Sequence, residues 1–161
     1  MLQGKMALIT VTVLVLGLLG GYIAYAGEAN IMVMPSEIKW TDGPASLPPG
    51  AKIAVIEGDL SKAVPFTFRL KMPANYKIAP HWHPAIEHVT VVSGTFYFGA
   101  GDTYDMAKAK AFPAGSIMVM PATHTMFGWA EATADETVIQ VHGVGPWGIT
   151  YVNSADDPRK K

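Results

Sequence analysis

The stretch HWHPAIEHVTVVSG, residues 81–94, combines two histidines separated by one residue with a glutamate four positions further on. Side chains at alternate positions of an extended segment lie on the same face, so His81 and His83 are expected to point toward one site. Glu87 follows a short break that contains proline, and we expect it to reach the same site from the next strand. Imidazole and carboxylate groups together suit a first-row divalent metal, so the stretch predicts a metal site.

A fourth ligand is expected from a distant strand. His124, in the stretch MPATHTMFGW of residues 120–129, is predicted to complete the set. Three imidazoles and one carboxylate would leave coordination positions free for water or substrate. Such an open site can polarise an oxygen, generate hydroxide or bind dioxygen. One divalent transition metal ion is therefore the expected cofactor, and iron, manganese, nickel, copper and zinc all accept these donors.

The spacing His81-x-His83-x3-Glu87-x6-Gly94 resembles the first motif of the cupin superfamily. That motif usually opens with a glycine where this chain has Asn75, and asparagine tolerates a left-handed backbone better than most residues do. The resemblance implies an all-β fold built as a single cupin-type barrel, which is also described as a double-stranded β-helix or jelly-roll. It implies a fold and a metal more firmly than it implies a reaction.

A second stretch, Gly115-x5-Pro121-x2-His124, resembles a shortened and altered form of the second cupin motif. The family normally has Pro-x-Gly before its histidine, whereas this chain has Pro121-Ala-Thr123-His124. The resemblance covers roughly residues 40–152, and the chain looks most like small single-domain bacterial cupins of unassigned activity. Cupins often pair through β-strands, so the resemblance also implies a homodimer in which residues 27–50 are a plausible exchanged element.

The first 26 residues have the three parts of a secretory signal peptide. Lys5 gives a positive start, residues 6–19 form an apolar run, and Ala24-Tyr25-Ala26 is a small-residue cleavage signal. The alternative is an uncleaved membrane anchor, because an apolar stretch of about 20 residues can span a bilayer. Either reading places the domain outside the cytoplasm: exported to the periplasm or secreted, or anchored in the membrane and facing outward.

Composition limits the classes of partner. Removing Lys5 with the leader leaves 11 Lys and Arg against 13 Asp and Glu, a net charge of −2, and the basic residues form no patch outside the C-terminal tail. Nucleic acid is therefore not an expected partner, and the membrane is one only if the leader stays uncleaved. The chain has no cysteine, which excludes disulfides and thiolate metal ligands.

From residue 51 onward, short apolar runs alternate with Gly, Pro, Asn and Asp turns, the pattern of an all-β sandwich or barrel. We therefore expect an N-terminal arm or linker over residues 27–50, a cupin β-barrel over 51–155 and a disordered tail over 156–161. The predicted strands are 52–57, 65–71, 76–80, 87–93, 95–99, 116–120, 124–129, 137–142 and 148–152.

Alternation along the predicted strands suggests which further residues line the site. Met126 should face inward with His124, and Phe96 is expected at the cavity as well. Gln140 and His142 share one face of their strand, and two polar residues on one face suggest a polar cavity lining. We therefore interpret His142 as an acid, a base or an orienting group, with a hydrogen-bonded histidine at a strand end as the equal alternative. Glu87 is the second expected catalytic residue.

Together these features predict a metal-dependent enzyme that acts on a small molecule outside the cytoplasm. A dioxygenase-like oxidoreductase is slightly preferred over an isomerase or lyase, because methionines and aromatic residues suit an aromatic or phenolic substrate. The fold alone does not choose among these reactions. The alternative is a non-catalytic module that binds a metal or a small ligand.

Overall fold

The computed structural model describes residues 30–133 and 135–161. The leader expected over residues 1–26 lies outside the described residues. Residues Ile31–Lys161 form one compact unit. None of the helices in the described ranges has the length and apolar character that a membrane crossing needs.

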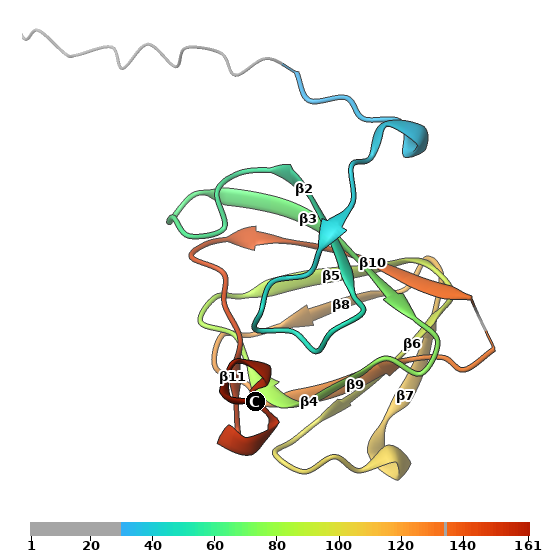
Figure 1. The fold of residues 1–161 in the computed structure, drawn as a ribbon, viewed down its shortest axis with the longest axis vertical. Coiled ribbons are helices and arrows are strands. Elements are labelled where there is room, and N and C mark those ends of the chain that lie inside the picture. Colours follow the sequence, from blue (N-terminus) through green and yellow to red (C-terminus); the bar gives the residue numbers. More distant parts are fainter. Residues whose placement is uncertain (1–29, 134) are drawn as a thin grey trace, which may run out of the picture. The chain divides into compact units, whose positions relative to one another are not determined.

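The prediction of an all-β fold is confirmed, because two antiparallel sheets make up the unit (Figure 1). One sheet has six strands in the order β1-β2-β3-β10-β5-β8, and the other has five in the order β11-β4-β9-β6-β7. The strands of the first sheet are β1 (Thr41–Asp42), β2 (Lys52–Glu57), β3 (Pro65–Pro73), β10 (Glu136–Val144), β5 (Glu87–Ser93) and β8 (Ile117–Met120). Those of the second are β11 (Thr150–Tyr151), β4 (Lys77–Trp82), β9 (Met126–Ala130), β6 (Thr95–Ala100) and β7 (Lys110–Pro113).

The core lies between the inner faces of the two sheets. In β3, buried residues with large apolar side chains alternate strictly with exposed or half-buried ones. Buried and less buried residues also alternate along most of β5 and β10, where Glu87 and Thr137 are the polar members of the buried face. Such alternation is expected when one face of an antiparallel sheet packs on the core and the other meets solvent. Phe66, Phe68 and Phe127 are the largest fully buried side chains, and each contributes about 1.5–3 kcal/mol by leaving water.

Two tight turns hold the strands that carry the site. Gly94 joins β5 to β6 with a φ of 71°, and a Cβ there would lie 2.7 Å from the Thr137 hydroxyl oxygen. Asn75, between β3 and β4, has a φ of 61°, as expected from the tolerance of asparagine for this conformation. Both turns therefore depend on residues that accept a left-handed backbone.

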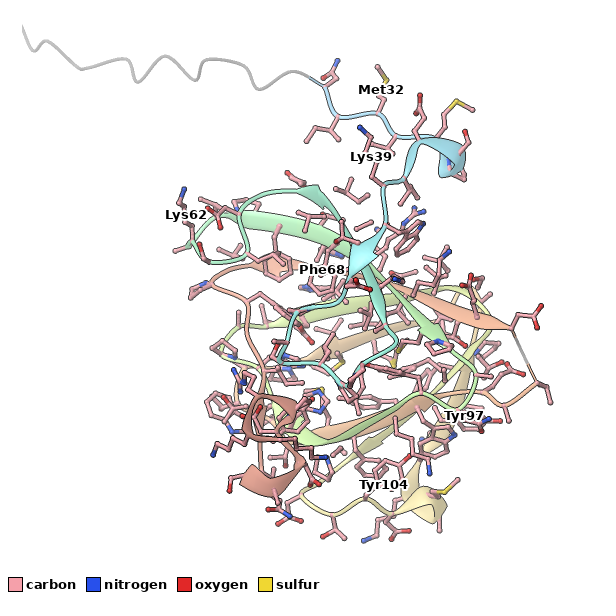
Figure 2. The ribbon with its side chains drawn as sticks, viewed as in Figure 1. Met32, Lys39, Lys62, Phe68, Tyr97 and Tyr104 are labelled. Carbon is pink, nitrogen blue, oxygen red and sulfur yellow. The ribbon has the colours of Figure 1, made fainter. Side chains whose placement is uncertain are left out.

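The N-terminal arm approaches the barrel through residues 41–50. A short 3-10 helix, η1 (Pro35–Glu37), precedes β1, and the side chain of Leu47 is buried in the core. Two tyrosines hold the same segment, because the Tyr76 hydroxyl donates to the Pro48 carbonyl and the Tyr151 hydroxyl donates to the Ser46 carbonyl. The apolar side chains before η1 are exposed, and Met32 extends from the body of the unit (Figure 2).

The C-terminal segment differs from the disordered tail that the sequence predicts. It forms two 3-10 turns, η3 (Ser154–Asp156) and η4 (Pro158–Lys160). The side chains of Asn153 and Asp157 cap these turns by accepting backbone N–H groups, and the Arg159 guanidinium pairs with the Asp157 carboxylate at 2.7 Å. These local bonds order a stretch whose composition alone suggests fraying.

Candidate metal site

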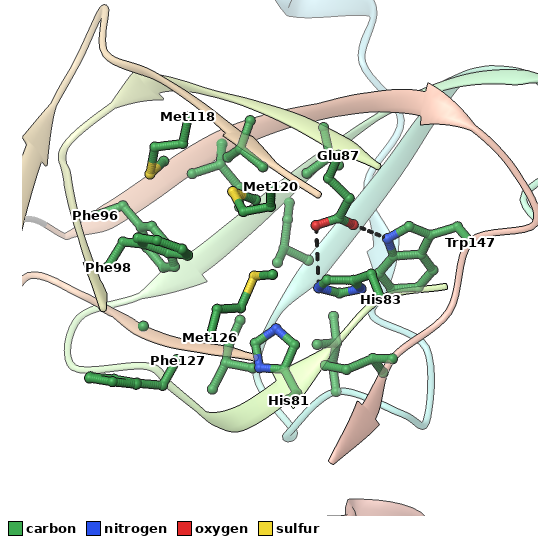
Figure 3. Close-up of a pocket in the computed structure, with 18 of the residues that line it drawn as sticks. His81, His83, Glu87, Phe96, Phe98, Met118, Met120, Met126, Phe127 and Trp147 are labelled. Atoms are coloured by element: carbon green, nitrogen blue, oxygen red, sulfur yellow. Dashed lines mark hydrogen bonds and ion pairs between the residues drawn. The ribbon is translucent and has the colours of Figure 1, made fainter. Parts of the chain in front are cut away.

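His81, His83 and Glu87 lie together on the wall of one cavity (Figure 3). His81 is near the end of β4, His83 directly follows that strand, and Glu87 begins β5. All three residues are buried, with exposed fractions of 5%, 6% and 3%. The cavity measures about 50 Å³, which is room for roughly three or four water-sized groups.

Backbone carbonyls fix the tautomer of both histidines. The His81 Nδ1 lies 2.7 Å from the Ala79 carbonyl oxygen, and the His83 Nδ1 lies 2.7 Å from the Gly148 carbonyl oxygen. A carbonyl oxygen only accepts, so Nδ1 must carry the hydrogen in each ring. Each neutral ring then presents a bare Nε2 lone pair. Metal-binding histidines are commonly oriented by this arrangement.

Glu87 faces the free nitrogen of His83. The distance from His83 Nε2 to Glu87 Oε2 is 3.2 Å, and the other oxygen, Oε1, accepts a hydrogen bond from the Trp147 indole N–H. A neutral imidazole Nε2 and a carboxylate oxygen are both acceptors, so only a proton or a cation between them makes this distance favourable. The pair therefore suits either a shared proton or a bound metal.

Burial makes charge costly in this cavity. Desolvation, with a smaller contribution from the neighbouring His83, lowers the pKa of His81 to about 3. Desolvation also raises the pKa of the Glu87 carboxyl, against the opposing effects of His83 and the Trp147 indole. His81 is thus a neutral donor at physiological pH. A nearby positive charge would favour the ionised form of Glu87.

The structure does not bring His124 to the other three residues. His124 is exposed, in the turn before β9, and it is absent from the cavity wall. Thr123, whose backbone N–H donates to the His83 carbonyl, has a φ of 64°, and this left-handed residue reverses the chain. The strand β9 begins only at Met126, two residues after His124. Met126 is buried and pairs in register with His81, as its predicted inward position requires, whereas His124 lies before the strand.

Gln140 and His142 share one face of β10, as the sequence predicts, but that face is the outer one. The inward residues of β10 are Thr137, Ile139 and Val141. His142 is exposed and stacks on His88 of β5 at 4.7 Å between ring centroids. Gln140 accepts a hydrogen bond from the Arg69 guanidinium. Polar residues on one strand face therefore mark the solvent side here, which is the usual position in an antiparallel sheet.

The rest of the cavity wall is apolar. Phe96 and Met126 line it, and so do Met118 and Met120, which the sequence pattern does not assign to the site. Trp147 contributes the indole that binds Glu87. No local spacing predicts that contact, because the two residues are 60 positions apart. Among the residues that the structure describes, no three His, Cys, Asp or Glu side chains converge as a metal-binding group.

The sequence matches no family model and no curated protein. Solved structures do resemble the fold. The polyketide cyclase RemF from Streptomyces resistomycificus superposes with a TM-score of 0.62 at 14% identity over 80% of this chain and 89% of its own. A candidate acetylacetone dioxygenase from Methylibium petroleiphilum PM1 gives 0.59 at 16% identity, over 79% of this chain and 83% of its own.

An RmlC-like cupin from Shewanella frigidimarina NCIMB 400 gives a TM-score of 0.54 at 11% identity, over 72% of this chain and 91% of its own. At such identities the likeness establishes the fold alone. The two-sheet barrel of this chain is accordingly a cupin fold, as its first motif indicates.

Proposed function

We propose that this protein is a metal-binding cupin whose ion is held by His81, His83 and Glu87. The observation that carries the proposal is the 3.2 Å approach of two acceptor atoms, His83 Nε2 and Glu87 Oε2, in a buried cavity. The carbonyl-bound Nδ1 atoms of both histidines support it, because they leave each Nε2 free to bind a cation. His124 and His142 lie outside this set.

We favour a metal-dependent enzyme that acts on a small molecule, with a dioxygenase-like oxidoreductase ahead of an isomerase or lyase. A bound metal would act as a Lewis acid or bind oxygen. The chain's own groups would do the rest. Glu87 can hold or pass a proton at Oε2, the Trp147 indole fixes the other carboxylate oxygen, and the apolar wall excludes water from the reacting group. That wall suits an apolar or aromatic substrate.

The size of the cavity favours a second candidate, a non-catalytic module that binds a metal or a small ligand. About 50 Å³ accommodates an ion with one or two small ligands, and a larger substrate would require movement of the wall. A binding module would hold its metal tightly and show no turnover. An enzyme would turn over a substrate from a screen chosen by metal type.

We propose export as the setting, with cleavage after Ala26 and a membrane-anchored, outward-facing chain as the alternative. The sequence of residues 1–26 supports this. Mass spectrometry of the protein recovered from a bacterial host would decide between them. A mature N-terminus at Gly27 fits cleavage, and an intact leader in the membrane fraction fits anchoring.

Elemental analysis tests the metal proposal. The chain would be expressed with its own leader and purified without a histidine tag, to avoid added ligands. We expect about one transition-metal ion per chain. Optical and electron paramagnetic resonance spectra would then separate iron and copper from zinc, which is silent in both. A protein that stays free of metal after reconstitution with each candidate ion would refute the proposal.

A further inference from the structure

Two methionines lie directly opposite proposed ligands, each on the neighbouring strand of the same sheet. In the β4–β9 pairing, Met126 is the register partner of His81, and in the β5–β8 pairing, Met120 is the register partner of Glu87. Side chains directly opposite on antiparallel strands have Cβ atoms about 4.5–5.5 Å apart, which lets a long thioether and an imidazole reach one point. Both methionines are buried and line the same cavity as His81, His83 and Glu87.

The Met126 sulfur projects toward the space between His81 and the His83–Glu87 pair (Figure 3). Met118 lies away from the histidines, at the end of the cavity with Phe96 and Phe98. The three methionines of the wall therefore differ in position, although they share burial and chemistry. Only Met126 and Met120 lie opposite a proposed ligand.

We infer that Met126 is a ligand and that the site selects copper in its cuprous state. The inference rests on the proposed function, because it assumes that the cavity binds a metal. Thioether sulfur is a soft donor that selects Cu(I), whereas hard ions such as Mg(II) and Mn(II) prefer oxygen. Two neutral imidazoles and one thioether form a neutral donor set that leaves a single positive charge on the ion. That charge matches the one carboxylate in the cavity, Glu87.

The apolar wall favours the same ion. A divalent ion on neutral donors with one carboxylate keeps a net positive charge, which is costly to bury. Cu(I) with Glu87 ionised leaves the cavity neutral. Methionine also serves as a flexible filler of apolar cores. Filling the core accounts for Met118. It gives no reason for a thioether to lie opposite His81, where other apolar side chains would fill the space equally well.

Competition titrations under reducing, oxygen-free conditions test the inference. Cu(I) would be titrated against bicinchoninate and Zn(II) against a chromophoric zinc chelator, for the full chain and three variants. Met126→Leu should weaken Cu(I) binding by at least about tenfold, since losing even a partner that orients a ligand costs about 10–100-fold. Met118→Leu, the matched control, should leave Cu(I) affinity unchanged. Met126→His should shift the preference toward Zn(II), because imidazole suits zinc.

X-ray absorption at the copper edge provides a readout that does not depend on affinity. The wild-type protein should show a sulfur scatterer beside nitrogen, and Met126→Leu should lose it. Copper bound through nitrogen and oxygen alone, with unchanged affinity in Met126→Leu, would overturn the role of Met126 and leave the metal site standing. Failure of the wild-type protein to bind any ion would overturn both proposals.

Discussion

At the residue scale, the site combines groups whose neutral and charged forms have very different energies. His81 is buried against His83, and its ring is held by the Ala79 carbonyl. Two buried imidazoles side by side disfavour a positive charge in the absence of a compensating anion. Glu87 can supply that anion, although burial raises the pKa of its carboxyl. The charge states of the three residues therefore depend on one another and on the proton or cation that lies between them.

The lowered pKa of His81 predicts a pH dependence for the metal-free protein. The unfolded His81 takes up a proton below about 6.5, whereas the folded side chain stays neutral down to about 3. The unfolded state thus binds more protons in this window, so stability is present above pH 6.5 and is lost as pH falls toward 3. Urea unfolding of the apo protein should show this loss, and His81→Gln should flatten it. Parallel pH profiles for the two proteins would contradict the buried, neutral His81.

At the scale of elements, the sequence predicts most of the strands because their alternation is regular. The predicted strand 87–93 coincides with β5 (Glu87–Ser93), and 52–57 coincides with β2 (Lys52–Glu57). Predictions from alternation are wrong in two places: where the backbone is irregular, and where the wrong face of a strand is taken as the inner one. The left-handed Thr123 breaks the count that places His124 inside. In β10 the period-two pattern is right, but the inner face carries Ile139 and Val141, so the sequence interpretation that put polar residues on the cavity side chose the wrong face.

The hairpin between β5 and β6 depends on glycine for two separate reasons. Gly94 has a φ of 71°, and a Cβ there would lie 2.7 Å from the Thr137 hydroxyl and 3.1 Å from backbone atoms of β10. Gly115, which lies between β7 and β8, has a φ of 90°, but a Cβ at that position would meet nothing within 4 Å. A substitution there therefore measures the cost of the left-handed backbone alone. Gly115→Ala should lower the free energy of unfolding by about 1–2 kcal/mol, and Gly94→Ala should lower it by more. Equal urea midpoints for the two variants would show that the close approach at Gly94 is relieved without cost.

At the scale of the whole molecule, the exposed apolar arm supports a proposed homodimer. Met32 is 83% exposed and Met34 is 65% exposed, just before η1. Exposed apolar side chains grouped this closely before η1 favour burial against a partner. A second copy of the chain is the partner that the resemblance to cupins implies. Replacing both with serine should shift a dimer toward monomer in sedimentation velocity. Met106→Ser, at a site 57% exposed on η2 (Met106–Lys108), is the matched control and should not. A wild-type protein that sediments as a clean monomer would refute the dimer.

The central claim concerns the metal, and a matched pair of histidine variants tests it most directly. His83 is buried against Glu87, whereas His142 is exposed on the outer face of β10. Metal content and melting temperature would be measured for His83→Ala and His142→Ala. We predict that His83→Ala loses the ion and the stability that binding provides, about 2.7 kcal/mol at a free metal concentration 100 times the Kd, and that His142→Ala retains both. Unchanged metal content in His83→Ala would contradict the site built on His81, His83 and Glu87.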